Sequence, residues 1–318
     1  MEPSSPSRSV LSLPPSPGLA DAELSDAIPS PPPSPSPRRV VRARDRSELA
    51  AVETTRLTKV RRTKGGGSRG RFRVKDFTSL IRRVLLDAIG HYRTRVSTEY
   101  AYPVNDEDEQ WAVEAWLCAC RDAGVDIPME DAFVAMITAR ASHVRGELKT
   151  KARSLVELVY GLQAPSGQDE RLKNRNKVRD LLTRLAYTYA DYENRSGIYQ
   201  NEVIQRLINA TWFANPKDEG IRYQRYFGKR MPIPTIALVL TAIENVLDEW
   251  RTGEREDIQF TAKLYQAKYD RHLYELERFH DKTKRYKIIP SIQSDLLNRA
   301  RYVLMIMCLC LLDGSLAV

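Results

Sequence analysis

The chain has 318 residues, of which 42% are hydrophobic and 29% charged, and its mean hydropathy is −0.46. This composition allows a globular core and argues against an integral membrane protein. Four cysteines without a Cys-x-x-Cys pair exclude a disulfide scaffold and the common zinc frameworks. The formal net charge of +9 is typical of proteins that bind polyanions, so its distribution along the chain matters.

The first 37 residues form a segment rich in proline and serine. It holds eleven of the eighteen prolines and ten serines, with one basic and four acidic residues. Because proline removes backbone donors and few large apolar side chains are present, we expect a disordered tail over residues 1–37. Ser-Pro occurs five times in this tail, which predicts either a plain spacer or a target of proline-directed phosphorylation. The serines are Ser5, Ser16, Ser30, Ser34 and Ser36.

Residues 38–75 carry most of the positive charge, with fourteen lysines and arginines against three acids. We expect a basic flexible arm here. Clustered lysine and arginine neutralise phosphates without sequence preference, and two clusters at this spacing also suit a bipartite nuclear-import signal that an acidic receptor groove reads. The residues predicted to contact nucleic acid or an import receptor are Arg38, Arg39, Arg42, Arg44, Lys59, Arg61, Arg62, Lys64, Arg69 and Arg71.

No continuous apolar stretch follows a basic start at the N-terminus, so we expect no secretion signal. The predicted compartment is the nucleus, with the cytoplasm as the alternative. The longest apolar run, Val303 to Leu312, has ten residues and is shorter than the ~20 that span a bilayer. We therefore expect no membrane partner.

From residue 76 onward the apolar pattern is helical. Between Glu130 and Tyr160, apolar residues recur at spacings of three and four, which predicts one continuous long helix. A second clear stripe runs from Ile236 to Trp250, and no alternating pattern long enough to predict a strand is present. We expect a single all-α domain of about eight helices over residues 76–318. The weaker helical patterns lie near 77–96, 107–123, 170–190, 201–214, 259–282 and 291–312.

Residues 171–179 form a second basic run, at or just inside a helix start. On a helix, Arg171, Arg175 and Arg179 share one face at i, i+4 and i+8 and could straddle a phosphate backbone. A solvated charged face is the alternative interpretation and the more common one. We interpret the basic set on the long helix as surface in the same way: Arg140, Arg145, Lys149 and Arg153.

No complete catalytic or metal-binding motif is present. Glu277 and His280 have the Glu-x-x-His spacing of di-iron helix bundles, but such sites need a second Glu-x-x-His, which is missing. His272 flanks an apolar stripe, and we interpret it as a hydrogen-bonded histidine at the edge of the core. We therefore expect no cofactor, no metal and no assigned catalytic residue, although a missing motif does not exclude an enzyme.

Aromatic and sulfur-containing side chains are interpreted as packing residues. Tyr223, Tyr226 and Phe227 are interleaved with basic residues in a pattern that resembles a base-stacking platform, but aromatics beside helix-start prolines are more often core. Cys118 and Cys120 lie too close on a helix to aim both sulfurs at one ion, so we expect small buried hydrophobes.

Several stretches together resemble a known family. They are residues 145–153 leading to Tyr160 and Gly161, residues 208–213 before 218–220, residues 232–244 followed by 248–253, and residues 269–273. Their order and spacing are similar to an uncharacterised domain of mushroom-forming fungi, the domain of unknown function of family 6532, over roughly residues 76–285. The resemblance implies a fungal intracellular protein with a variable disordered N-terminus. It implies no activity, cofactor or catalytic residue.

We therefore expect a non-enzymatic nuclear interaction protein. Its arm would support import and loose nucleic-acid contact, and its helical domain would bind an unknown macromolecule, such as a protein partner. The alternative is an enzyme or small-molecule binder with a pocket between helices, for which Glu244, Asp248 and His272 are the polar candidates. A homo-oligomeric structural protein is a third possibility and would need an exposed apolar patch, such as the helix at 303–312.

Overall fold

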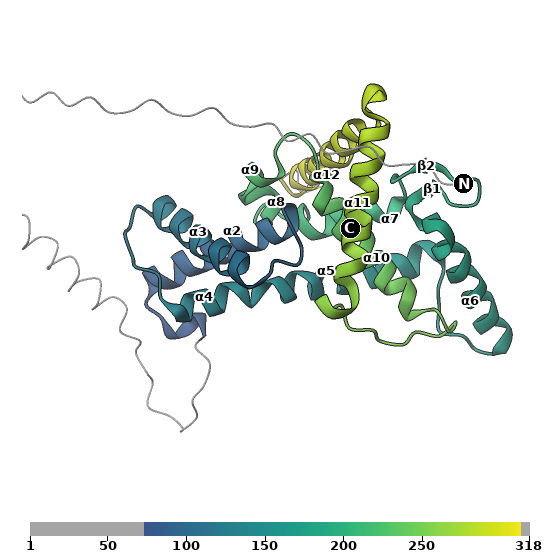
Figure 1. Ribbon diagram of the computed structural model, residues 1–318, viewed down its shortest axis with the longest axis horizontal. Helices are drawn as coiled ribbons and strands as arrows, with labels where there is room; N and C mark the ends of the chain where they lie inside the picture. Colours follow the sequence, from purple (N-terminus) through teal and green to yellow (C-terminus); the bar gives the residue numbers. More distant parts are fainter. Residues whose placement is uncertain (1–72, 313–318) are drawn as a thin grey trace, which may run out of the picture. The chain divides into compact units, whose positions relative to one another are not determined.

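The computed structural model describes residues 73–312, except the side chains of residues 304 and 306–312. All of them belong to one unit of the chain, Leu49–Val318. In this described part, α-helices dominate and the only sheet is a two-stranded hairpin, which confirms the all-α prediction. The elements in chain order (Figure 1) are η1 (Val74–Asp76), α2 (Ser79–Thr98), α3 (Asn105–Ala123), α4 (Asp131–Thr138), α5 (Arg140–Tyr160), α6 (Gln168–Leu182), η2 (Thr183–Thr188), β1 (Tyr189–Asp191), β2 (Ser196–Ile198), α7 (Glu202–Trp212), α8 (Glu219–Arg222), α9 (Gln224–Phe227), α10 (Ile233–Glu249), α11 (Ala262–Lys282), η3 (Lys284–Tyr286) and α12 (Ile288–Leu312).

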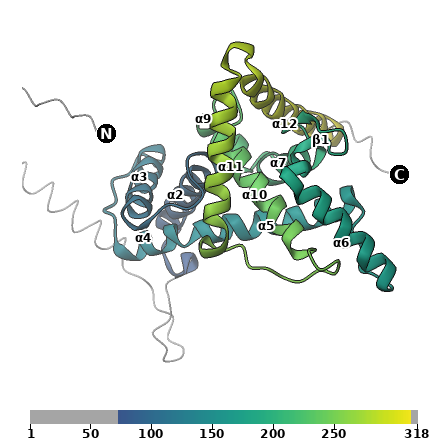
Figure 2. The same ribbon diagram turned by 45° about the vertical axis from the view of Figure 1, so that its right-hand side comes forward.

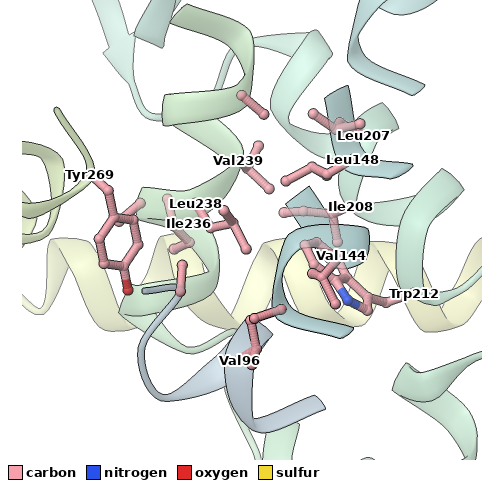
Figure 3. Close-up of a cluster of buried hydrophobic side chains, with 14 of the residues drawn as sticks. Val96, Val144, Leu148, Leu207, Ile208, Trp212, Ile236, Leu238, Val239 and Tyr269 are labelled. Carbon is pink, nitrogen blue, oxygen red and sulfur yellow. The ribbon is translucent and has the colours of Figure 1, made fainter. Parts of the chain in front are cut away.

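Helix α10 is the centre of the core. Every residue from Thr235 to Glu249 is buried, because the helix is apolar over most of its circumference and such a helix lies inside a fold. Helices α5, α7 and α11 pack against it, and Figure 2 shows α10 between them. Figure 3 shows the resulting cluster, which joins side chains of α10 to those of α2, α5, α7 and α11: Val96, Val144, Leu148, Leu207, Ile208, Trp212, Ile236, Leu238, Val239 and Tyr269.

Helices α2, α3 and α4 pack against one another and join this core through α2. Trp116 on α3 stacks on Phe133 of α4 with ring centroids 4.5 Å apart. The indole Nε1 of Trp116 donates to the carbonyl oxygen of Ile127 at 2.9 Å. This buried indole is therefore hydrogen-bonded, and the bond fixes the loop between α3 and α4.

The long helix predicted from Glu130 to Tyr160 is interrupted, and that prediction was wrong at Ala139. Helix α4 ends at Thr138 and α5 begins at Arg140. The Thr138 hydroxyl donates to the carbonyl oxygen of Val134 at 3.1 Å, a back-bond that bends helices. The buried Tyr92 hydroxyl donates to Asp108 and lies 3.4 Å from the Thr138 carbonyl oxygen, so a polar group from α2 faces the break. The apolar stripe continues through the break, so periodicity alone could not reveal it.

The helix predicted at 170–190 is longer than the observed helix α6. The prediction that the chain has no strand was also wrong in this region. Helix α6 ends at Leu182, after which Arg184 and Leu185 take left-handed conformations with φ of 51° and 55°. Strands β1 and β2 then pair antiparallel in a hairpin. Asp191 accepts hydrogen bonds from the backbone N–H groups of Glu193 and Asn194 and forms its turn. Strands of three residues are too short to show alternation.

The other predicted helices are confirmed with small shifts at their ends. The C-terminal helix α12, for example, begins at Ile288 rather than at residue 291. Among the helices of the described part, none has the length and apolar character to cross a membrane.

Candidate functional site

The ten arm residues predicted to contact nucleic acid or an import receptor lie outside the described residues. They are Arg38, Arg39, Arg42, Arg44, Lys59, Arg61, Arg62, Lys64, Arg69 and Arg71. The predicted basic face at 171–179 lies inside the described part, on α6. The candidate site is therefore built from α6 and from what surrounds it.

Helix α6 is a strongly charged helix with two acids in its first turn, Asp169 and Glu170, which complement the N-terminal end of its dipole. Arg171 is held against the loop after α10, since its Nε donates to the carbonyl oxygen of Thr252 at 3.2 Å. The two backbones approach so closely that a Cβ on Gly253 would lie 2.1 Å from the Arg171 carbonyl oxygen. Arg171 therefore anchors α6 to the end of α10.

Arg175 and Arg179 lie further along α6, near a third arginine, Arg251, from the turn that follows α10. The three border a hollow of about 390 Å³ that Val178, Leu182 and Thr183 also line. The predicted set of three is thus divided, because Arg171 does not line this hollow. Arg251 was not among the predicted residues, since nothing in the sequence places residue 251 beside α6.

The arginines of this hollow are only partly neutralised. Arg179 lies 3.3 Å from the adjacent Asp180, and both side chains are more than half exposed. Arg251 donates from Nε to Asp248 at 2.7 Å, but 60% of the Arg251 side chain is exposed, against 6% for Asp248. Within the described part of the chain, the side chain of Arg175 has no ion-pair or hydrogen-bond partner. A cation in the last turn offsets the helix dipole, which accounts for Arg179 but not for three arginines around one hollow.

Beside this hollow lies a network of buried charges on α10. Glu244 accepts hydrogen bonds from Nε2 of His272 at 2.7 Å and from Arg271 at 2.6 Å. Burial alone would raise the pKa of Glu244, but the His272 hydrogen bond and the charges of Lys268 and Arg271 lower that pKa to about 2. Burial lowers the pKa of His272, and Glu244 only partly offsets this effect. A neutral His272 therefore donates to an ionised Glu244.

One turn further along α10, two more buried acids are paired with cations. Asp248 accepts hydrogen bonds from Tyr265 at 2.9 Å and from Lys268. Glu249 pairs with Lys149 at 2.8 Å and with Arg153 at 2.7 Å, both from α5. The carboxylates of α10 thus join the helix to α5 and α11.

The prediction of a solvated basic set on the long helix was wrong for two of its members. Arg145 is 8% exposed and Lys149 is 7% exposed. Arg145 donates to the carbonyl oxygen of Ala101 at 2.8 Å and lies over the ring of Tyr102. These residues are buried because they have partners in distant segments of the chain, which a charge pattern along one helix does not reveal.

The polar candidates for an enzyme, Glu244, Asp248 and His272, are brought together, but in an ion-pair network rather than in a cleft. Two hollows reach the edge of this network, one through Arg251 and one through Arg271. None of the three candidates lines either hollow. Each of the two carboxylates is contacted by three side chains of neighbouring segments, an arrangement that holds helices together.

A second polar cluster, which the sequence analysis missed, lies between α2 and α3. His91 is 2% exposed, and its Nε2 lies 3.2 Å from Asp122 and 3.9 Å from Asp87. Its Nδ1 faces Arg225 at 3.1 Å and the hydroxyl of Tyr226 at 3.4 Å. Burial first, and then the Arg225 charge, lower the pKa of His91 against the effects of both aspartates. The i, i+4 spacing of Asp87 and His91 was a visible signal, whereas the approach of Asp122 was not.

The aromatic residues near this cluster are core residues, as predicted. Tyr223 and Phe227 are buried. The ring of Tyr223 packs edge-on against His91, with centroids 4.5 Å apart. One of the interleaved arginines contacts the cluster, since Arg222 pairs with Asp87 at 2.9 Å.

Fold and sites together define an all-α domain with a buried charged helix, a basic hollow beside α6 and a histidine–aspartate cluster between α2 and α3. Residues 87–279 match the family described as Domain of unknown function (DUF6532), and the chain belongs to that family. The match confirms the resemblance seen in the sequence and includes the residues of all three sites. No curated protein and no solved structure matches the chain.

Proposed function

We propose that this chain is a non-enzymatic nuclear interaction protein. The arm of residues 38–75 supports nuclear import and loose contact with nucleic acid, and the helical domain binds a macromolecular polyanion through the basic surface of α6. The observation that carries the second part is the hollow in which Arg175, Arg179 and Arg251 meet. Import receptors read such arms through an acidic groove, so the nucleus is the proposed compartment and the cytoplasm the alternative.

The arm acts through charge alone. Fourteen basic residues against three acids can neutralise several phosphates, and each neutralised phosphate releases condensed counterions. Binding of this kind has no sequence preference and weakens steeply with salt, by about 0.9 in log K per phosphate for each tenfold rise in salt. An arm of this type concentrates the domain near nucleic acid without selecting a site.

The hollow beside α6 supports a more defined contact. Arg251 is held by the buried Asp248 through Nε, so its guanidinium is positioned before a ligand arrives and less side-chain entropy is lost on binding. Arg175 is free to bind an anion, because its side chain has no ion-pair or hydrogen-bond partner within the described part. Guanidinium groups match the geometry of phosphate oxygens, which favours a phosphate backbone as the ligand.

The test is fluorescence anisotropy with mixed DNA and RNA oligonucleotides at several salt concentrations. Four full-length proteins are compared: wild type, a variant with all ten arm residues changed to Gln, the α6 variant Arg175→Gln/Arg179→Gln, and the control Arg206→Gln/Arg278→Gln. The control removes the same charge from two exposed ion pairs on other helices. We expect the arm variant to lose most of its affinity and the α6 variant to lower the salt slope by about 1 for each lost phosphate contact.

Two results would contradict parts of this proposal. If the α6 variant binds like the control, the helical domain does not contact nucleic acid through the hollow. If wild type itself does not bind at low salt, neither the arm nor α6 is a nucleic-acid site, and an acidic protein becomes the remaining polyanionic partner of the proposal.

A second candidate function is a binder of small molecules. A hollow of about 400 Å³ between η2, the hairpin and α11 is bordered by Arg184, Leu185 and Tyr199, with φ of 51°, 55° and 58°. Left-handed non-glycine residues cost about 1–3 kcal/mol each and cluster at ligand sites. This observation favours a binding pocket over an enzyme, because the acid–base candidates of α10 do not line it.

A further inference from the structure

Asp87, His91 and Asp122 come together away from the α6 surface. Asp87 and His91 are one helical turn apart on α2, and Asp122 comes from α3, which packs along α2. Nε2 of His91 and one carboxylate oxygen from each aspartate all lie within 4.8 Å of one another. Three potential ligand atoms from two packed helices thus surround one point in space.

The surrounding residues hold these groups in place. Tyr223 and Arg222 both donate to Oδ1 of Asp87, at 2.7 Å and 2.9 Å, which leaves Oδ2 on the side of His91. The ring of Tyr223 also packs against His91. Tyr223 can approach only because residue 90 is glycine, since a Cβ there would lie 2.1 Å from the Tyr223 hydroxyl. Such outer contacts orient the ligands of protein metal sites.

The cluster is open to solvent on one side. A hollow of about 560 Å³ is lined by Asp87 and Asp122, by two arginines and by apolar residues. The arginines are Arg83 and Arg222, and Arg222 is paired with Asp87. The side chain of His91 is 3% exposed, whereas that of Asp122 is 50% exposed. An ion can therefore enter along the aspartates and keep water on its open side, with His91 behind it.

We propose that Asp87, His91 and Asp122 bind one divalent transition-metal ion. One imidazole nitrogen with two carboxylate oxygens suits Zn²⁺, Mn²⁺, Co²⁺ or Fe²⁺, whereas Ca²⁺ and Mg²⁺ prefer oxygen ligands only. The ion completes its coordination with water in the hollow, and small movements of the two aspartates bring their oxygens to bonding distance.

Positive charge opposes the metal, since Arg83 and Arg222 line the hollow. A third arginine, Arg225, contacts the proposed histidine ligand and provides a specific test. Arg225 donates to Nδ1 of His91, which keeps the ring proton on Nε2, the atom that must bind the ion. Metal binding through Nε2 requires the ring proton on Nδ1, and the Tyr226 hydroxyl, 3.4 Å away, can accept a hydrogen bond from Nδ1–H. Arg225 is exposed and can move aside. Arg225 therefore competes with the metal by fixing the wrong tautomer and by adding positive charge.

The experiment is a titration of the untagged full-length protein with Co²⁺, followed by visible absorption, and with Zn²⁺, followed by calorimetry. We expect one ion per chain in wild type. Asp122→Asn and His91→Gln should raise the Kd by about tenfold or more, the scale on which even outer contacts change metal affinity. Asp126→Asn and His143→Gln are matched controls, because both residues are exposed and lie outside the cluster, and they should bind as wild type does.

Arg225→Gln should change the Kd for the metal in the opposite direction. The change removes the positive charge of the guanidinium. It also introduces an amide oxygen that can accept a hydrogen bond from Nδ1–H of His91, so the Kd for the metal should fall by about tenfold. A structural role of the cluster alone predicts no metal response to this variant. His91 is buried, so if His91→Gln does not fold by circular dichroism, Asp122→Asn and Arg225→Gln decide the matter. Absence of binding by wild type, or unchanged binding by Asp122→Asn, would overturn the proposal.

Discussion

The buried acids of α10 are the clearest case in which a single residue connects distant segments. Glu249 is 1% exposed and pairs with Arg153, 96 residues earlier in the chain. Removing two charges from water costs about as much as their attraction returns, so such a pair contributes little net stability while intact. Leaving one member unpaired is costly. These pairs therefore select the arrangement of α5, α10 and α11 more than they stabilise it.

Glu244→Gln tests the cost of leaving members of a buried ion pair unpaired. The substitution leaves His272, Lys268 and Arg271 without their carboxylate. We expect a loss of about 1–3 kcal/mol in the free energy of unfolding at pH 7, the cost of an incompletely satisfied buried group, because Lys268 and Arg271 are partly exposed and water can replace their partner. Urea denaturation measures the loss, and Glu202→Gln, which breaks an exposed pair with Arg206, should cost much less.

The stability that Glu244 contributes should fall as the pH falls. The pKa of Glu244 is about 2 in the folded protein, against an ordinary value of 4.5, so its contribution is present above pH 4.5 and is lost as the pH falls toward 2. The gap between wild type and Glu244→Gln should therefore narrow over this window. His272 and His91 act in the same direction from pH 6.5 downward, because their lowered pKa values make the unfolded chain take up protons first. A gap that stays constant from pH 7 to the acid limit of folding would contradict the assignment.

At the scale of whole elements, the sequence predicts the helices that have a clear apolar periodicity. It misses the features that depend on contacts between distant segments. The stripe from Ile236 to Trp250 predicted α10 because most of its circumference is apolar. The break at Ala139 was missed because the apolar stripe continues through it and the hydroxyl that faces it, from Tyr92, is far away in the chain. The basic face of α6 was visible in the sequence, but its third arginine, Arg251, depends on how α6 packs against the end of α10.

Two glycines inside helices predict opposite results for the same substitution. Gly90 on α2 meets Tyr223, whose hydroxyl would lie 2.1 Å from an added Cβ, so Gly90→Ala should destabilise the fold by about 1–3 kcal/mol. Gly146 on α5 has nothing within 4 Å of such a Cβ, so Gly146→Ala should stabilise by about 0.5–1 kcal/mol through helix propensity. Urea denaturation of both variants checks the signs. Equal effects would mean that Tyr223 is not packed against α2.

For the whole molecule, the uneven distribution of charge along the chain is the dominant physical fact. The arm of residues 38–75 has eleven more basic than acidic residues, whereas the remainder of the chain is close to neutral. On the function proposed above, we expect long-range attraction to polyanions to originate in the arm and defined contacts in the helical part. Of the apolar helix predicted at 303–312, the side chains of Val303 and Met305 are exposed, and the others lie outside the described part. The homo-oligomer that this helix suggested therefore stays a prediction.

The Ser-Pro sites place a possible counter-charge beside this arm. A phosphate adds about −1.5 to −2 charge at pH 7, so five of them add about −8 to −10 and nearly cancel the excess positive charge of the arm. We expect full-length protein treated with a proline-directed kinase to bind oligonucleotides more weakly, with a smaller salt slope, in the anisotropy assay. The control is a variant with Ala at all five serines, treated identically, which should bind like untreated wild type. If phosphorylated and control proteins bind equally, the tail is a plain spacer, because added charge next to the arm cannot leave a purely electrostatic contact unchanged.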